Sequence, residues 1–150
     1  MNMGIEINNY ELTFTTAGHS DIIDITAAVS EKVAEGGLLE GQIVLFVPGS
    51  TAALTTIEYE RGVLRDLKEA IERLAPEGLR YHHDERWGDG NGHAHVRAAL
   101  MGPSLTIPVI RGALCLGTWQ QIVLIDFDNR PRKRRVILQL WGAKSGASRL

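Results

Sequence analysis

The chain has 150 residues, of which 44% are hydrophobic and 23% charged, and its formal net charge is −2. This length and composition suit one soluble domain with a full core, and the small negative charge argues against nucleic acid as a partner. The single cysteine excludes an intramolecular disulfide and favours a reducing compartment, and no apolar run reaches the ~18 residues of a membrane span. We therefore expect one domain over residues 1–150, in the cytoplasm, with no membrane partner.

The first half of the chain predicts alternating strands and helices. Residues 5–16 alternate loosely between polar and apolar side chains, which is typical of a strand. An amphipathic helix is expected next, with its N-cap among residues 19–21 and its end at Gly36-Gly37. The patterns that follow predict two strands and a second helix, at residues 43–47, 52–59 and 61–74.

The second half of the chain predicts mostly strands. Residues 81–95 are expected to form a loop, followed by a short helix over residues 96–101. Turn residues then separate strands that form hairpins, expected at residues 104–110, 113–116, 120–127 and 134–140. Residues 143–150 are expected to be a flexible tail. This order is typical of an α+β fold with antiparallel or mixed sheets, two main helices and one short helix.

Four of the five histidines lie in one segment, at positions 82, 83, 93 and 95. Imidazole is a common metal ligand, and acidic side chains of the same segment (Asp84, Glu85 and Asp89) are available to complete the coordination. On a regular helix His93 and His95 point roughly 200° apart, whereas on an extended backbone they share a side. Either His93 precedes the helix, or one of the two is not a ligand. The segment predicts a divalent metal site (Zn or another transition metal, with Mg as the alternative), against histidines that are merely solvated.

Two other segments carry groups that bind anions. The turn Gly49-Ser50-Thr51 offers backbone and hydroxyl donors, although a plain hairpin turn explains it equally well. Glu58, on the strand that follows, could project into the same pocket. In the basic run 130–135, strand alternation places Arg132 and Arg134 on one side. Either this run is a solvated edge, or that pair of arginines clamps a phosphate.

A tryptophan and two amides interrupt an apolar part of the sequence, at Trp119, Gln120 and Gln121. Because buried amides need hydrogen-bond partners, these residues fit a binding site or a subunit interface better than a core. Trp119 is either a core residue or a ring on which a heteroaromatic substrate stacks.

Four segments of the chain resemble the YjbQ family. They are the Ser-Thr-Ala-Ala-Leu-Thr segment at 50–55, Asn-Gly-His-Ala-His at 91–95, Leu-Met-Gly-Pro-Ser-Leu-Thr-Ile-Pro at 100–108 and Leu-Gly-Thr-Trp-Gln-Gln-Ile-Val-Leu at 116–124. The resemblance runs from about residue 5 to residue 142. It implies an α+β fold, a homotrimer and a histidine-lined site, and it implies secondary thiamine-phosphate synthase activity, a weak side activity of family members.

The family's usual histidines map onto His83, in a Tyr-x-His segment, and onto His95, in an Ala-His pair. The chain departs from the pattern at Gly49, which stands where the family has a histidine. It also has Ile57 before Glu58 where the family has Asn-Glu. If the site needs three imidazoles, we infer that His93 supplies the one missing at position 49. The alternative is a reduced or altered site, which would put metal binding in question.

The resemblance implies a transferase that joins a pyrimidine-methyl diphosphate to a thiazole phosphate and releases pyrophosphate. Such a reaction depends on positioning the substrates and neutralising phosphate charge. The catalytic candidates are His83, His95 and Glu58, and the metal candidates are His83, His93 and His95. The substrate-binding candidates are Ser50, Thr51, Trp119, Gln120, Arg132 and Arg134. Because clustered imidazoles favour transition metals over Mg²⁺, a metal-dependent hydrolase such as a phosphatase is a second hypothesis. A non-catalytic trimeric metal- or metabolite-binding protein is the third.

Overall fold

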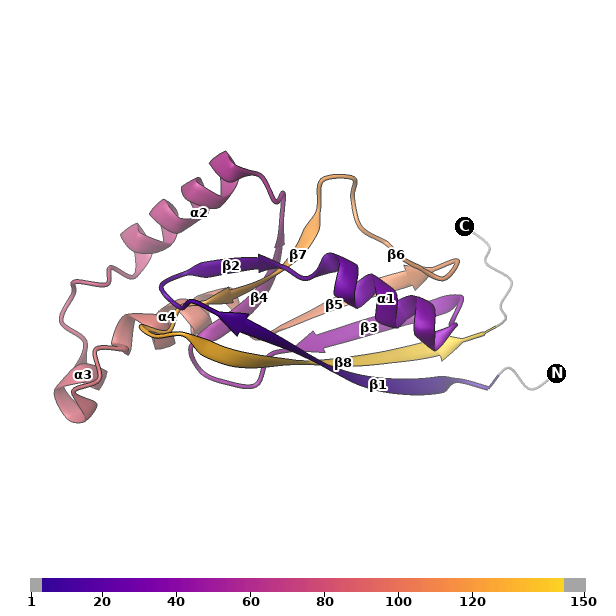
Figure 1. Ribbon diagram of the computed structural model, residues 1–150, viewed down its shortest axis with the longest axis horizontal. Helices are drawn as coiled ribbons and strands as arrows, with labels where there is room; N and C mark the ends of the chain where they lie inside the picture. Colours follow the sequence, from indigo (N-terminus) through magenta and orange to yellow (C-terminus); the bar gives the residue numbers. More distant parts are fainter. Residues whose placement is uncertain (1–3, 145–150) are drawn as a thin grey trace.

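The computed structural model describes residues 4–144 and has an α+β fold (Figure 1). Its strands are β1 (Glu6–Thr16), β2 (Asp21–Asp24), β3 (Glu40–Phe46), β4 (Ala52–Ile57), β5 (Ser104–Ile110), β6 (Ala113–Leu114), β7 (Gln121–Asp126) and β8 (Arg132–Ala143). Its helices are α1 (Thr26–Gly36), α2 (Arg61–Leu74), α3 (His82–Trp87) and α4 (Gly92–Met101). Every strand pair in the described residues is antiparallel, in a larger sheet of order β1-β8-β3-β5-β6 and a smaller one of order β2-β7-β4.

The longest ladder joins the two ends of the chain. β1 pairs with β8 from Glu6, opposite Gly142, to Thr16, opposite Arg132. The other edge of β8 pairs with β3, so that β8 lies between the two strands. The predicted flexible tail included Ala143, which belongs to β8 instead. Residues 145–150 of the predicted tail lie outside the described residues.

The smaller sheet is buried on both faces. One face contributes to the main core, which the larger sheet and α1 complete, through Ala52, Leu54, Ile122 and Leu124. The other face contributes to a second core beneath α2 and α4, through Ala53, Val123 and Ile125. Since successive side chains of a strand alternate between faces, a strand covered on both sides becomes continuously apolar. Each such Leu, Ile or Val stabilises the fold by about 1.5–3 kcal/mol when fully buried.

The first predicted helix starts later than its sequence pattern indicates. His19 and Ser20, predicted as N-caps, have φ angles of +53° and +63° and form a left-handed turn after β1. Residues 21–24 then pair with β7 as β2, and the helix begins only at Thr26. Ile22 and Ile23 thus lie on opposite faces of a short strand and pack against different cores. The predicted helix end is confirmed, since Gly37 caps α1 with φ +64°.

The second predicted helix is confirmed as α2, with the predicted bounds. Its N-cap is Glu60, whose carboxylate accepts hydrogen bonds from the N–H groups of Gly62 and Val63 at 2.8 and 3.0 Å. These two bonds lower the pKa of Glu60. Within this fully described helix Ile71 is the one buried residue, and α2 stands away from the sheets at the upper left of Figure 1.

The histidine segment is more helical than predicted. Residues 82–87 form α3, and α4 begins at Gly92 instead of residue 96, so residues 4–144 contain four helices where three were expected. A tertiary contact explains the early start of α4. The Oδ1 atom of Asp84 accepts a hydrogen bond of 2.8 Å from the Gly92 N–H, one of the donors that a helix start leaves unsatisfied. Within residues 4–144, every helix is too short or too polar to span a bilayer.

Candidate functional site

A pocket of about 300 Å³ lies between the turn that precedes β4 and one side of α4. It is lined by Gly49, Ser50, Ala52, His95, Ala98, Ala99 and Pro103. The structure therefore brings the Gly-Ser turn and His95 together, although they are far apart in the sequence. We call this space the Gly49–His95 pocket.

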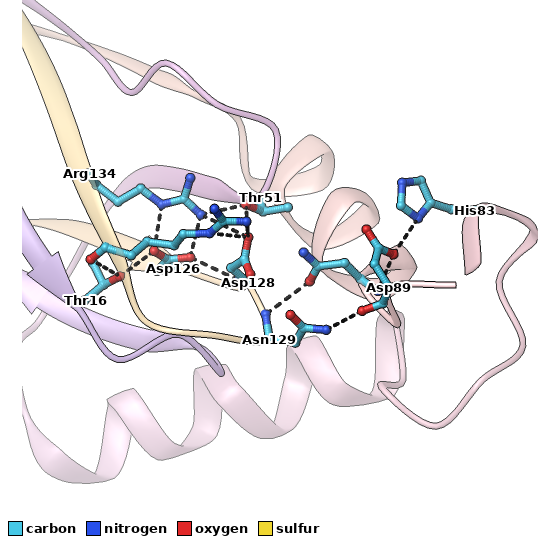
Figure 2. Close-up of polar contacts among 10 residues, drawn as sticks. Thr16, Thr51, His83, Asp89, Asp126, Asp128, Asn129 and Arg134 are labelled. Atoms are coloured by element: carbon cyan, nitrogen blue, oxygen red, sulfur yellow. Dashed lines mark hydrogen bonds and ion pairs between the residues drawn. The ribbon is translucent and has the colours of Figure 1, made fainter. Parts of the chain in front are cut away.

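His83 lies against His95. The centroids of the two rings are 4.3 Å apart and the ring planes make an angle of 45°. The side chain of His83 is 30% exposed, and its Nδ1 atom lies 3.3 Å from Oδ1 of Asp89 (Figure 2). The same atom lies 3.5 Å from Oδ1 of Asp84. Because His83 belongs to α3 and His95 to α4, the packing of these two short helices positions the imidazole pair.

Three side chains of this segment are close enough to share a metal ion. His83, Asp84 and Asp89 each offer a ligand atom, and these atoms lie within 4.8 Å of one another. No other such group is found in residues 4–144. Ligands bound at ~2.0–2.1 Å in a tetrahedron are about 3.3–3.4 Å apart, close to the contacts of His83 Nδ1. An imidazole with two carboxylates is a donor set that suits Zn²⁺ and similar transition metals.

His93 points away from this group. It is 1% exposed, and its ring centroid lies 6.4 Å from that of Tyr81. Its Nδ1 atom has no hydrogen-bond partner. Burial, and then the nearby charge of Arg97, lower the pKa of His93, so the neutral imidazole is favoured. The structure does not bring His83, His93 and His95 together as three ligands, because His93 and His95 lie two positions apart on the regular helix α4.

Arg132 and Arg134 lie on the same side of β8, as strand alternation predicts, but both pair with buried carboxylates. Nε and Nη2 of Arg134 donate to the two oxygens of Asp126 at 2.7 and 2.8 Å. Nε of Arg132 donates to Asp128 at 3.0 Å. The two guanidinium groups predicted to clamp a phosphate are therefore held by the protein's own carboxylates.

Two threonines complete what we call the buried polar cluster, which consists of Thr16, Thr51, Asp126, Asp128, Arg132 and Arg134. The hydroxyl of Thr51 donates to Asp128 at 2.9 Å and accepts from Arg134 at 2.6 Å, so this predicted substrate ligand is engaged within the fold. Burial raises the pKa of Asp128, but hydrogen bonds from Arg132 and Thr51 outweigh it and hold this pKa below its usual range.

Asp126 and Asp128 were not among the site residues predicted from the sequence. Their partners come from β1, from the turn before β4 and from β8, so no local spacing connects them. One signal was available: two aspartates flank Phe127 directly after an apolar strand, where an unpaired carboxylate would be costly.

The other predicted residues lie at the far end of β4. Glu58 and Trp119 line a second pocket of about 430 Å³, together with Asp24, Tyr59, Glu60, Thr118 and Gln121. Trp119 is 72% exposed, so it is not a core residue, and Gln120 donates from Nε2 to Thr56 at 3.0 Å. At ~3.3 Å per residue, the length of β4 separates this pocket from the Gly49–His95 pocket by roughly 20 Å. Within one chain, Glu58, Trp119 and Gln120 are not neighbours of the imidazole pair.

The fold and the pocket define an α+β protein of two antiparallel sheets, with a histidine pair beside a Gly-Ser turn. The model of the family described as UPF0047 protein YjbQ-like matches residues 10–143. A UPF0047 protein of Archaeoglobus fulgidus is 45% identical over 129 residues, which cover 86% of this chain and 98% of the relative. A UPF0047 protein of Methanothermobacter thermautotrophicus is 36% identical over 138 residues, covering 92% and 94%.

Crystal structures of similar proteins have the same fold. A YbjQ-like protein of unknown function from Sulfolobus solfataricus superposes with a TM-score of 0.88 at 30% identity, covering 93% of this chain and 99% of that one. A YjbQ/UPF0047 family protein from Clostridium acetobutylicum superposes with a TM-score of 0.80 at 38% identity, covering 87% and 98%. The chain belongs to the YjbQ/UPF0047 family, and the resemblance noted in the sequence is confirmed.

Proposed function

We propose that this protein is an enzyme that acts on small phosphorylated substrates, with a reaction of the thiamine-phosphate synthase kind. The observation that carries the proposal is the Gly49–His95 pocket, in which a donor-rich turn faces an imidazole that packs on a second imidazole. The turn supplies N–H and hydroxyl groups for phosphate oxygens. Together these groups can bind a phosphate and hold a proton near it.

In this transfer the protein has to position the two substrates and stabilise the charge on the leaving group. The thiazole nitrogen forms a bond to the methylene carbon of the pyrimidine, and the bond from that carbon to the diphosphate oxygen breaks. The leaving pyrophosphate takes the electron pair, so negative charge builds on its oxygens. Donors from Ser50 and the turn stabilise this charge, and His95 can hold a proton beside the departing oxygen.

An assay with a pyrimidine-methyl diphosphate and a thiazole phosphate tests this proposal. We expect His95→Ala and His83→Ala to lower kcat/KM by about 10²–10⁴-fold, the usual contribution of acid–base groups. His82→Ala is the matched control, because His82 belongs to the same helix as His83 but is fully exposed. Full activity in the His95 variant, or an equal loss in the control, would count against a role for the pocket.

A metal-dependent hydrolase, such as a phosphatase, is the second candidate function. The observation that favours it is the convergence of donor atoms from His83, Asp84 and Asp89. A divalent transition metal there would supply Lewis acidity for hydrolysis of a phosphate ester. Asp84 would also keep its contact with α4, since its Oδ1 accepts from Gly92.

Metal titration separates the two candidates. We expect Co²⁺ to give a visible absorption band on binding to the wild type, and Asp89→Asn to weaken that binding about tenfold or more. Glu85→Gln is the matched control, because Glu85 lies on α3 outside the donor group. Equal Co²⁺ affinity in both variants would rule out this donor group as the metal site.

We also infer that the protein assembles as a homotrimer, as the family resemblance implies. Exposed apolar side chains beside the weakly packed helix α2, such as Tyr59 and Trp119, support this inference. Light scattering would then give three times the chain mass of 16.5 kDa. A mass equal to that of one chain would contradict it. A trimer that binds phosphate or metal but turns over no substrate would favour the non-catalytic alternative.

A further inference from the structure

A guanidinium nitrogen of Arg134 lies next to Gly49, one of the residues that line the Gly49–His95 pocket, and it has no hydrogen-bond partner among the described residues. We propose that Nη1 of Arg134, with Ser50 and His95, forms an oxyanion subsite that takes a tetrahedral phosphate group. The subsite would bind the phosphate of the substrate in the proposed reaction. The identity of the whole substrate rests on that proposed function. The phosphate group itself is identified from the chemistry of the subsite.

Hydrogen bonds fix the guanidinium of Arg134 in place but leave one of its nitrogens without a partner among the described residues. Nε and Nη2 make hydrogen bonds to Asp126 and Thr51, whereas Nη1 makes none among the described residues. The buried side-chain atoms without a partner in residues 4–144 are Asn8 Nδ2, His93 Nδ1 and Asp128 Oδ1. Nη1 is not one of these buried atoms, although the Arg134 side chain is only 10% exposed. Since Nη1 also has no hydrogen-bond partner among the described residues, it is in contact with solvent. Figure 2 shows the carboxylate of Asp126 and the hydroxyl of Thr51 holding the other side of this guanidinium.

Gly49 provides the access to Nη1. A Cβ atom at position 49 would lie 3.1 Å from Nη1, with no other heavy atom beyond the chain neighbours within 4 Å. A side chain at this position would therefore crowd Nη1, and the glycine leaves this nitrogen open to a hydrogen-bond acceptor. The φ angle of Gly49 is +134°, a conformation that residues with side chains rarely adopt. The backbone thus keeps this position free of a side chain.

The other walls of the pocket suit the same ligand. Gly49, Ser50 and His95 all line it, and the hydroxyl of Ser50 lies in an exposed turn. The volume of about 300 Å³ is at the lower end of the range for small-molecule sites. It accommodates a phosphate and part of the molecule that carries it.

The subsite selects by hydrogen-bond direction more than by net charge. The carboxylates of Asp126 and Asp128 offset the guanidinium charges of Arg132 and Arg134. The attraction for an anion therefore comes from a preorganised donor, whose position the fold has already fixed. We expect phosphate and pyrophosphate to bind, and chloride and acetate to compete poorly.

Calorimetry with inorganic phosphate and pyrophosphate, on the full chain and without a second substrate, tests the subsite. Gly49→Ala places a methyl group against Nη1, and we expect it to weaken phosphate binding about tenfold or more. Gly37→Ala is the matched control, because Gly37 also has a positive φ (+64°) but has no atom within 4 Å of the added methyl. We expect this control to bind phosphate like the wild type.

Two results would overturn the subsite: wild-type affinity for phosphate in a folded Gly49→Ala variant, or no phosphate binding by the wild type. If Gly49→Ala does not fold, the ¹⁵N side-chain resonances of Arg134 in the wild type decide. A shift on phosphate addition supports the subsite, and an unchanged spectrum overturns it. Gly49-dependent phosphate binding without product formation would leave the subsite standing and reject the transferase. Product formation without Gly49-dependent phosphate binding would support the transferase and reject the subsite.

Discussion

Two groups of charged side chains lie near the Gly49 turn, and they differ in how completely they are paired. In the buried polar cluster, Asp126 and Asp128 are fully buried, and the arginines and threonines bond to them at 2.5–3.0 Å. Around His83, the contacts to Asp84 and Asp89 are 3.3–3.5 Å and the groups are partly exposed. In the first group the fold occupies Nε and Nη2 of Arg134 and leaves its Nη1 free among the described residues, whereas the second group has room for a ligand. A basic run and a histidine cluster are both signals of a binding site in a sequence. Here burial makes most of the first group structural and leaves the second open to a ligand.

The largest expected effect comes from breaking the buried polar cluster. Asp126→Ala removes the carboxylate that pairs most closely with the buried Arg134 guanidinium and leaves only Asp128, 3.6 Å from Nη2, which costs about 3–5 kcal/mol. The free energy of unfolding, measured in urea, would fall by that amount. Glu11→Ala is the control, because its 3.0 Å pair with Arg135 is exposed on both sides and we expect little change. Equal losses in the two variants would remove the distinction between the two kinds of pair.

A smaller effect is expected where the second group meets the fold. Asp84→Ala removes the acceptor of the Gly92 N–H at the start of α4, and one such bond contributes about 1 kcal/mol. The disturbance should remain local, so amide hydrogen exchange should speed up in α3 and the first turn of α4 more than in β7. Uniformly faster exchange across the molecule would show that α3 and α4 are as integral to stability as the buried polar cluster.

The smallest expected effect on stability at neutral pH comes from His93. This residue is buried but belongs to neither of the two groups. Its pKa is lowered in the folded state from an ordinary value of 6.5. The unfolded chain therefore binds a proton first as pH falls. The stability contributed by the neutral ring is complete above pH 6.5 and is lost as pH drops toward the lowered folded pKa.

Urea unfolding at pH 7.5 and pH 5 checks this behaviour of His93. We expect the loss of stability between the two pH values to be smaller in His93→Leu than in the wild type. His82→Ala, which alters an exposed ring, should retain the wild-type pH dependence. An unchanged pH dependence in His93→Leu would mean that other groups account for the loss.

Local sequence patterns correctly predicted those elements whose structure depends mainly on their own residues. α2 has the predicted bounds because its apolar face and the turn beyond it are both encoded within the helix and its flanks. Strand alternation likewise placed Arg132 and Arg134 on one side of β8. In these cases the period of the side chains is the physical cause, and it is visible in the sequence.

Tertiary contacts decided what the sequence could not show. Residues 21–24 have a helical pattern but pair with β7, since an available strand edge outweighs a weak helical preference. The early start of α4 depends on Asp84, and this start separates His93 from His95. The partners of the two arginines are Asp126, the last residue of β7 in the other sheet, and Asp128, which lies just beyond that strand. No spacing within the basic run identifies them.

The pairing of β1 with β8 has a consequence for biosynthesis. On the ribosome β1 emerges well before β8, so β1 waits unpaired while the residues between the two strands are translated. β3 waits for the same partner along one of its edges. During this interval the open edges and the apolar side chains of Tyr10, Leu12 and Phe14 are exposed to other nascent chains. Truncated products that lack β8 should therefore aggregate, whereas a chain that contains β8 can complete the larger sheet.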